Sequence, residues 1–230
     1  VMSLLDAKAS ITNGKWYCDR GEEKKAYELF FNALENGKEC PELELTGLVL
    51  KRVSRSWKLL EDDVRAFLKT LAVRVDLYLD QLEDIVGQKR SEHGLPDNLQ
   101  DIVEDPYLLC EFFVGDGPDD IIPWSTLDRG VFPSPELGGE VLCDMLLDDP
   151  RRLRSLCVEQ LRREPNQTFR PADVILKEIN ARMDRLPEWK RHNFTLRYFD
   201  VDRDDLEKAL VLREEEGRLF LYLKNVYFDE

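Results

Sequence analysis

A repeat of apolar residues four and three positions apart is the feature that most restricts the fold of this chain. It runs through residues 61–86, where acidic and basic residues fill most of the positions between its members. The members are Val64, Leu68, Leu71, Val75, Tyr78, Leu82 and Ile85. This spacing places apolar side chains along one narrow side of a helix. The sequence therefore predicts one long helix over 61–86. About three heptads are too few for a free-standing coiled coil, so an internal helical hairpin is the favoured interpretation.

Two further helices are predicted before this repeat. Residues 22–36 place four apolar residues on one face: Tyr27, Phe30, Phe31 and Leu34. Gly37 follows them and is typical of a helix end. A second helix is expected over 42–59. Together these segments predict an N-terminal helical domain at residues 1–90, whose role the sequence does not indicate.

The last third of the chain predicts helices mixed with strands. Asp149 followed by Pro150 is typical of a helix start, and helices are expected over 150–163, 171–186 and 202–216. Strands are expected over two segments rich in aromatic and aliphatic residues, 194–199 and 218–228. This order favours a winged-helix-like α+β domain over residues 146–230. The expected fold class is therefore mainly α, with a loop-rich connector between the two domains.

The connector, residues 97–145, is acidic and rich in turn formers. Residues 115–140 contain four prolines and five glycines. They also contain more apolar residues than a disordered linker usually has: Ile121, Ile122, Trp124, Leu127, Val131 and Phe132. We therefore predict an ordered, loop-rich segment in which Trp124 and Phe132 are buried against the C-terminal domain.

Charge is distributed unevenly along the chain, whose formal net charge is −14. Residues 97–149 hold fourteen Asp or Glu against a single Arg, whereas residues 150–193 hold eleven Lys or Arg against six Asp or Glu. Binding to phosphates or to a partner is expected at five arginines: Arg151, Arg152, Arg154, Arg162 and Arg163. A solvated helix face is the alternative interpretation of this cluster. An acidic docking face is expected at three carboxylates: Asp116, Asp119 and Asp120.

No catalytic chemistry is predicted. The two histidines, His93 and His192, lie far apart, and the five cysteines form no Cys-x-x-Cys pair. Neither a zinc site nor a Cys–His nucleophile is therefore expected. The chain also lacks a phosphate-binding Gly-x4-Gly-Lys-Ser/Thr loop. We expect no metal, no cofactor, no membrane contact and a cytoplasmic location with reduced cysteines.

Several short segments are similar to the N-terminal region of RecD-like superfamily 1 DNA helicases. Asp105-Pro106-Tyr107-Leu108-Leu109 resembles their nPyxL segment, which leads into a helix-hairpin-helix element, and Thr168-Phe169-Arg170-Pro171 resembles their GHtxLP segment. Phe220–Tyr227 is similar to the strand that precedes their motor. The resemblance covers residues 97–230. It implies that residues 97–145 correspond to a degenerate helix-hairpin-helix.

Two functional hypotheses follow. The resemblance implies a non-catalytic accessory module of an ATP-dependent, helicase-like protein, which positions nucleic acid or a partner for a motor after residue 230. In this hypothesis DNA contacts the basic segment 150–193. The alternative is an adaptor or DNA mimic, in which the acidic segment 97–149 docks a basic protein or the chain's own motor. An independent enzyme is a third class, disfavoured by the absence of catalytic motifs.

Overall fold

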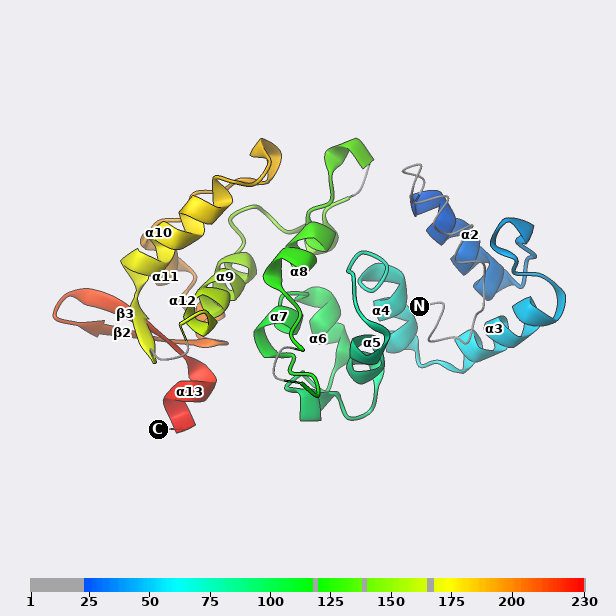
Figure 1. Ribbon diagram of the computed structural model, residues 1–230, viewed down its shortest axis with the longest axis horizontal. Coiled ribbons are helices and arrows are strands. Elements are labelled where there is room, and N and C mark those ends of the chain that lie inside the picture. The colour runs from blue at the N-terminus through cyan, green and yellow to red at the C-terminus, as the bar shows by residue number, and fades with distance from the viewer. Residues whose placement is uncertain (1–22, 118–119, 138–139, 165–167, 230) are drawn as a thin grey trace. The chain divides into compact units, whose positions relative to one another are not determined.

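The computed structural model describes residues 23–117, 120–137, 140–164 and 168–229 (Figure 1). These residues are mainly helical and contain a three-stranded antiparallel sheet near the C-terminal end. They divide into two compact units. Unit 1 takes the described residues of Val1–Glu104 and Ser134–Gly138, and unit 2 those of Asp105–Pro133 and Gly139–Glu230. Among the described residues, no helix combines the length and the apolar character that crossing a membrane requires.

Unit 1 consists of short helices joined by turns. Its α-helices are α2 (Glu23–Asn36), α3 (Gly47–Leu59), α4 (Asp62–Thr70), α5 (Leu79–Val86) and α6 (Leu99–Glu104). Its 3-10 turns are η1 (Pro41–Leu43), η2 (Arg90–His93) and η3 (Pro135–Leu137). The predicted helix over 22–36 is confirmed as α2, and Gly37 after it has a positive φ of 62°. The helix expected from residue 42 begins later, at Gly47.

The predicted long helix over 61–86 is wrong as a continuous element. Helix α4 ends at Thr70 and α5 begins at Leu79, so the backbone between them leaves the helix. β-Branched valines lie in this break, where they are poor helix formers. The carbonyl of Val73 instead accepts a 2.6 Å hydrogen bond from the Tyr27 hydroxyl. Most of the repeat is nevertheless buried, and its outlier is Tyr78, which is 76% exposed.

Unit 2 contains the sheet, which packs against α9, α10 and α13. Its α-helices are α7 (Leu108–Phe112), α8 (Trp124–Val131), α9 (Pro150–Arg162), α10 (Ala172–Met183), α11 (Arg197–Val201), α12 (Arg203–Leu206) and α13 (Lys224–Asp229). Its strands are β1 (Phe169–Pro171), β2 (Leu210–Glu215) and β3 (Arg218–Leu223), and its 3-10 turns are η4 (Leu142–Asp144) and η5 (Glu188–Lys190). Strand β3 lies between the other two, antiparallel to both.

The end of the chain differs from the sequence expectations. The strand predicted over 194–199 is wrong, because α11 begins there at Arg197. The helix predicted over 202–216 stops after α12, and its second half is strand β2. Gly217, interpreted as a helix stop, forms a two-residue hairpin turn with Glu216, and both have positive φ, 76° and 52°. Such a turn joins antiparallel strands directly. The last predicted strand ends at Leu223, where α13 begins.

The predicted connector, residues 97–145, is divided between the two units, and the larger part of its described residues belongs to unit 2. The boundary between the units falls after Glu104, and residues 105–133 pack with the helices that follow. Trp124 and Phe132 are both buried, as predicted, but Trp124 is the first residue of a helix, α8, that was not predicted, and Phe132 directly follows that helix. The guanidinium of Arg182 lies 4.5 Å from the centre of the Trp124 ring, which is a cation–π distance.

Candidate functional site

Arg152 of α9 lies in the interior of unit 2. Its side chain is fully buried and forms an ion pair with Asp128 of α8, with Nε 2.8 Å from Oδ1. Its remaining nitrogens donate to the carbonyls of Leu147 and Lys190, at 3.0 and 3.1 Å. Asp128 also accepts a 2.6 Å hydrogen bond from the Tyr107 hydroxyl and pairs with the Lys190 ammonium at 2.8 Å. This network joins α8 to α9 and leaves Arg152 no surface for a ligand.

Arg154 is buried in a second network two residues further along α9. Its Nε lies 2.8 Å from Glu111 Oε2, and its Nη2 lies 2.6 Å from Asp105 Oδ2. The remaining nitrogen, Nη1, donates to the carbonyl of Asp205 at 3.2 Å. One arginine therefore connects three segments of unit 2. Breaking such a buried pair by removing one partner is strongly destabilising, because the other charge is left without compensation.

The burial of the second network changes its acid–base properties. Burial raises the pKa of Glu111 to about 8, while the positive charge of Arg154 acts in the opposite direction. Burial also raises the pKa of the neighbouring thiol of Cys157. Cys157 is fully buried and Glu111 is 1% exposed, so the shifted carboxyl lies in the interior of unit 2. We therefore interpret it as part of the core of unit 2.

The other predicted arginines are only partly accessible. Arg151 pairs with Asp149 at 2.7 Å, and the same carboxylate caps α9 by accepting the Arg151 backbone N–H at 3.0 Å. Arg162 donates to the carbonyls of Cys110 and Glu111 at the end of α7. Arg163 alone among the five has an exposed side chain, 3.4 Å from Glu159.

The five arginines therefore do not form one phosphate-binding surface. The helix they lie on is confirmed, but Arg152 and Arg154 point inward and Arg162 is tied to backbone carbonyls. Phosphate binding needs charged N–H donors that can hydrogen-bond the phosphate and are not already occupied by groups of the protein. The sequence analysis missed this arrangement because the carboxylates that pair with Arg152 and Arg154 lie 24 to 49 positions earlier in the chain.

The predicted acidic docking face is placed only in part. Asp116 is exposed, and Asp119 lies outside the described residues. Asp120 is half-buried, and its backbone N–H and carbonyl close a tight turn with Gly117 and Gly115 at 3.0 Å each. A Cβ on Gly115 would come within 1.8 Å of Asp120 Oδ2, so glycine is required there for this close approach. The segment is a compact turn at the surface of unit 2.

A different acidic surface is present between α9 and α11. We call it the acidic groove, a depression of about 540 Å³. It is lined by Leu146, Asp148, Asp149, Pro150, Asn193, Thr195, Arg197, Tyr198, Val201 and Asp202. Leu146 and Val201 are 68% and 66% exposed and provide two apolar side chains on this charged surface.

The acidic groove carries a negative field. The pKa of Asp202 is raised, first by partial burial and then by the negative charges of Asp205, Asp148 and Asp149. The hydroxyl of Tyr198 lies 2.9 Å from His192 Nε2 at the edge of the groove. Burial lowers the pKa of His192, which favours the neutral form of its imidazole. The groove therefore suits a positively charged group next to an apolar one.

The signal for this groove in the sequence was weak. The alternating carboxylates of Asp200, Asp202 and Asp204 fit a helix start as well as a binding surface. Exposure of Val201 between them is visible only in the folded chain. Within the described residues, no group of three or more His, Cys, Asp or Glu is arranged to hold a metal ion. The four described cysteines are free thiols.

Comparison with known proteins gives one relative. The chain is 31% identical over 170 residues to an uncharacterized protein of Methanocaldococcus jannaschii. The match covers 73% of this chain but 13% of that protein, which is therefore about 1,300 residues long. No protein-family model and no solved structure match the chain.

Proposed function

We propose that this chain is a non-catalytic accessory module of a larger, helicase-like ATP-dependent protein, and that unit 2 docks a basic protein surface. The resemblance of residues 97–230 to RecD-like helicases supports the first part. The small share of the archaeal relative that the chain spans is consistent with a module of a longer polypeptide. The acidic groove is the observation that carries the second part.

The winged-helix-like interpretation of unit 2 is part of this proposal. Helix α9, strand β1, helices α10 to α12 and the β2–β3 hairpin follow one another in that order, and β3 pairs with both other strands. A winged helix has this order, with its third helix and its hairpin turn directed at a ligand. Here α11 and α12 take the place of the third helix.

The charges at these positions favour the binding of a protein over the binding of nucleic acid. Three exposed carboxylates occupy the hairpin and its turn: Glu214, Glu215 and Glu216. Helices α11 and α12 together carry more acidic than basic residues, and the acidic groove begins beside them. Phosphates would be repelled from this side of unit 2. A basic surface with an apolar anchor would be attracted to the carboxylates and could cover Leu146 and Val201.

Binding in trans tests the proposal. The chain is mixed with the separately expressed remainder of its parent polypeptide, and complex formation is followed by size-exclusion chromatography and calorimetry. We expect a complex that the Asp148→Lys, Asp202→Lys double substitution weakens at least tenfold. The expected cause is the loss of two attractive charges and the gain of two repulsive ones at the groove.

The matched control is Asp184→Lys with Glu188→Lys. Both residues are exposed on unit 2 and lie outside the groove lining, and the change in net charge is the same. The control variant should bind like the parent chain. Equal weakening of binding by both variants would indicate an effect of net charge alone. If the remainder of the parent polypeptide did not hydrolyse ATP, the helicase-like part of the proposal would be contradicted.

A further inference from the structure

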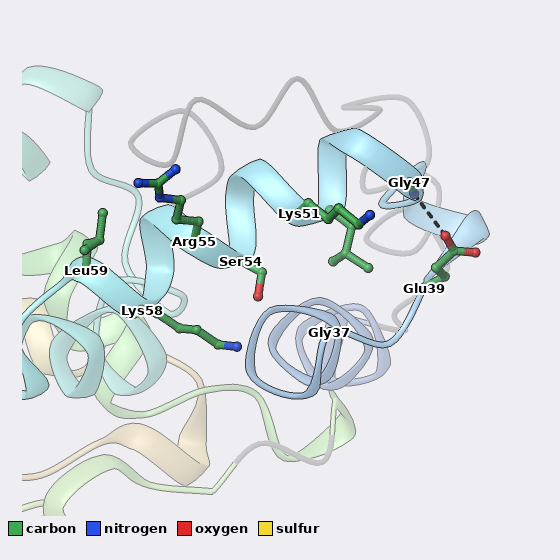
Figure 2. A pocket seen from close by; sticks show the side chains of 9 residues that line it. Gly37, Glu39, Gly47, Lys51, Ser54, Arg55, Lys58 and Leu59 are labelled. Atoms are coloured by element: carbon green, nitrogen blue, oxygen red, sulfur yellow. Dashed lines mark hydrogen bonds between the residues drawn. The ribbon is translucent and has the colours of Figure 1, made fainter.

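Unit 1 has a groove of opposite charge between the end of α2 and one side of α3 (Figure 2). It has a volume of about 540 Å³ and is lined by Gly37, Glu39, Gly47, Leu50, Lys51, Ser54, Arg55, Lys58 and Leu59. We call it the basic groove. Ser54 fixes its floor, because its buried hydroxyl donates a 2.7 Å hydrogen bond to the carbonyl of Leu34 in α2.

Three cations follow the groove along α3. Lys51, Arg55 and Lys58 are spaced four and three residues apart, which places them on neighbouring turns of one helix. Along the axis they span about 10 Å at 1.5 Å per residue. Figure 2 shows Lys58 extending towards the chain at Gly37, and Lys51 lying nearer the Gly47 end. All three side chains are exposed.

These cations have no carboxylate partners in the described part of unit 1. Among the described residues that line the groove, Glu39 is the only acidic one, and its carboxylate accepts the Gly47 backbone N–H at 3.0 Å near the start of α3. Helix α3 itself contains no acidic residue. The positive charges of Lys51, Arg55 and Lys58 are therefore not neutralised by an ion pair with any described residue.

We propose that the basic groove binds the sugar–phosphate backbone of nucleic acid without regard to base sequence. Protein-docking surfaces usually centre on a buried aromatic or apolar anchor, whereas the described lining residues include no aromatic side chain and only one exposed apolar side chain, that of Leu59. They also include no Asn or Gln side chain that would read base edges. A row of unneutralised cations supplies the electrostatic, sequence-independent part of nucleic-acid binding.

This inference goes beyond the proposed function, because it assigns a ligand to unit 1. It also moves the nucleic-acid contact from the arginines of α9 to the cations of α3. The two proposals are independent: the acidic groove can dock a protein whether or not the basic groove binds phosphates.

Fluorescence anisotropy of the 230-residue chain with labelled oligonucleotides provides the test. A single-stranded oligothymidylate and a mixed-sequence strand of equal length are titrated at several salt concentrations. Three phosphate contacts to a single strand predict a slope of log K against log salt near −2, or a loss of about 20-fold between 50 and 200 mM salt. The two strands should bind with affinities within about threefold of each other.

The decisive variant is the triple substitution Lys51→Gln, Arg55→Gln, Lys58→Gln. It should lower the affinity at least tenfold at low salt and bring the salt slope close to zero. The matched control removes three exposed cations from unit 2: Arg163→Gln, Lys177→Gln and Arg185→Gln. The control should keep the affinity within about threefold and retain the slope. Circular dichroism verifies that both variants are folded.

Three results would overturn the inference. The first is an affinity that the groove variant leaves unchanged. The second is an equal loss in the groove and control variants, since this would reflect net charge alone. The third is displacement of the oligonucleotide by a decaglutamate peptide as effectively as by unlabelled strand, because the groove would then recognise an acidic peptide. None of these results affects binding at the acidic groove.

Discussion

Helices α3 and α9 have the same length and the same number of basic residues, but opposite environments. Each has thirteen residues and four Lys or Arg. Arg152 and Arg154 of α9 are fully buried, whereas Lys51, Arg55 and Lys58 of α3 are exposed. The comparison shows that the number of cations on a helix does not indicate whether they serve folding or binding.

The elements that pack against each helix decide the difference. Helix α9 faces acidic side chains from its neighbours: Asp105, Glu111 and Asp128. Helix α3 packs on α2 through aromatic and aliphatic contacts, such as the ring of Phe31 lying 5.4 Å from that of Trp57. A buried arginine must be paired and hydrogen-bonded. An apolar neighbour supplies no such partner, so the cations of α3 remain in water.

The largest expected loss of stability comes from breaking the buried network of Arg152 and Asp128. Arg152→Ala leaves Asp128 buried with Lys190 and Tyr107 as its remaining partners, and should lower the free energy of unfolding by about 3–5 kcal/mol. Urea denaturation followed by circular dichroism measures it. A loss of less than 1 kcal/mol would show that Arg152 does not hold α8 and α9 together.

Over an interval of about two pH units, a smaller change in stability is expected through the second network. The folded chain holds the pKa of Glu111 at about 8, against an ordinary value of 4.5. Between these values the folded state binds a proton that the unfolded state has released. Stability from this group is therefore complete below pH 4.5 and is lost as pH rises towards 8, at up to about 1.4 kcal/mol per pH unit.

Comparing the parent chain with Glu111→Gln isolates this contribution. Unfolding free energies at pH 5.5 and 7.5 should fall less with pH in the variant, because glutamine does not titrate. The difference between the two slopes is the relevant quantity, since the substitution also changes the contacts of Arg154. Parallel pH profiles would mean that Glu111 is ionised throughout, with its charge compensated by Arg154.

The smallest effect on stability is expected on α3. Arg55→Ala removes an exposed cation without an ion pair in the described residues and should change the unfolding free energy by no more than about 0.5 kcal/mol. Urea denaturation measures the unfolding free energy of this variant in parallel with that of Arg152→Ala. A loss near that of the α9 variant would place Arg55 in a structural role and would remove the contrast between the helices.

Local signals in the sequence predicted several elements well. Asp149 and Pro150 predicted the start of α9, and the apolar face of residues 22–36 predicted α2. The apolar content of the turn-rich segment predicted the burial of Trp124 and Phe132. The two helices depend on neighbours within a few residues, so the local pattern contains the necessary information, whereas the burial of Trp124 and Phe132 was predicted from their apolar character alone.

Other features depended on distant partners and were missed. Strand β2 was interpreted as helix because it becomes a strand only through pairing with β3, as at Leu212 opposite Leu221. The burial of Arg154 depends on Glu111 and Asp105, which lie 43 and 49 positions away. The basic groove was overlooked for a related reason: a solvated helix face and a phosphate-binding face have the same local pattern.

Chemical modification of arginine tests the central contrast most directly, without any substitution. The native chain is treated with phenylglyoxal, and the modification of each arginine is followed by mass spectrometry with and without a single-stranded oligonucleotide. The account predicts rapid modification of Arg55, slowed by the oligonucleotide, and almost none at Arg152 and Arg154 until the chain is unfolded. Modification of Arg152 and Arg154 at the rate of Arg55, or protection of Arg163 rather than Arg55 by the oligonucleotide, would contradict it.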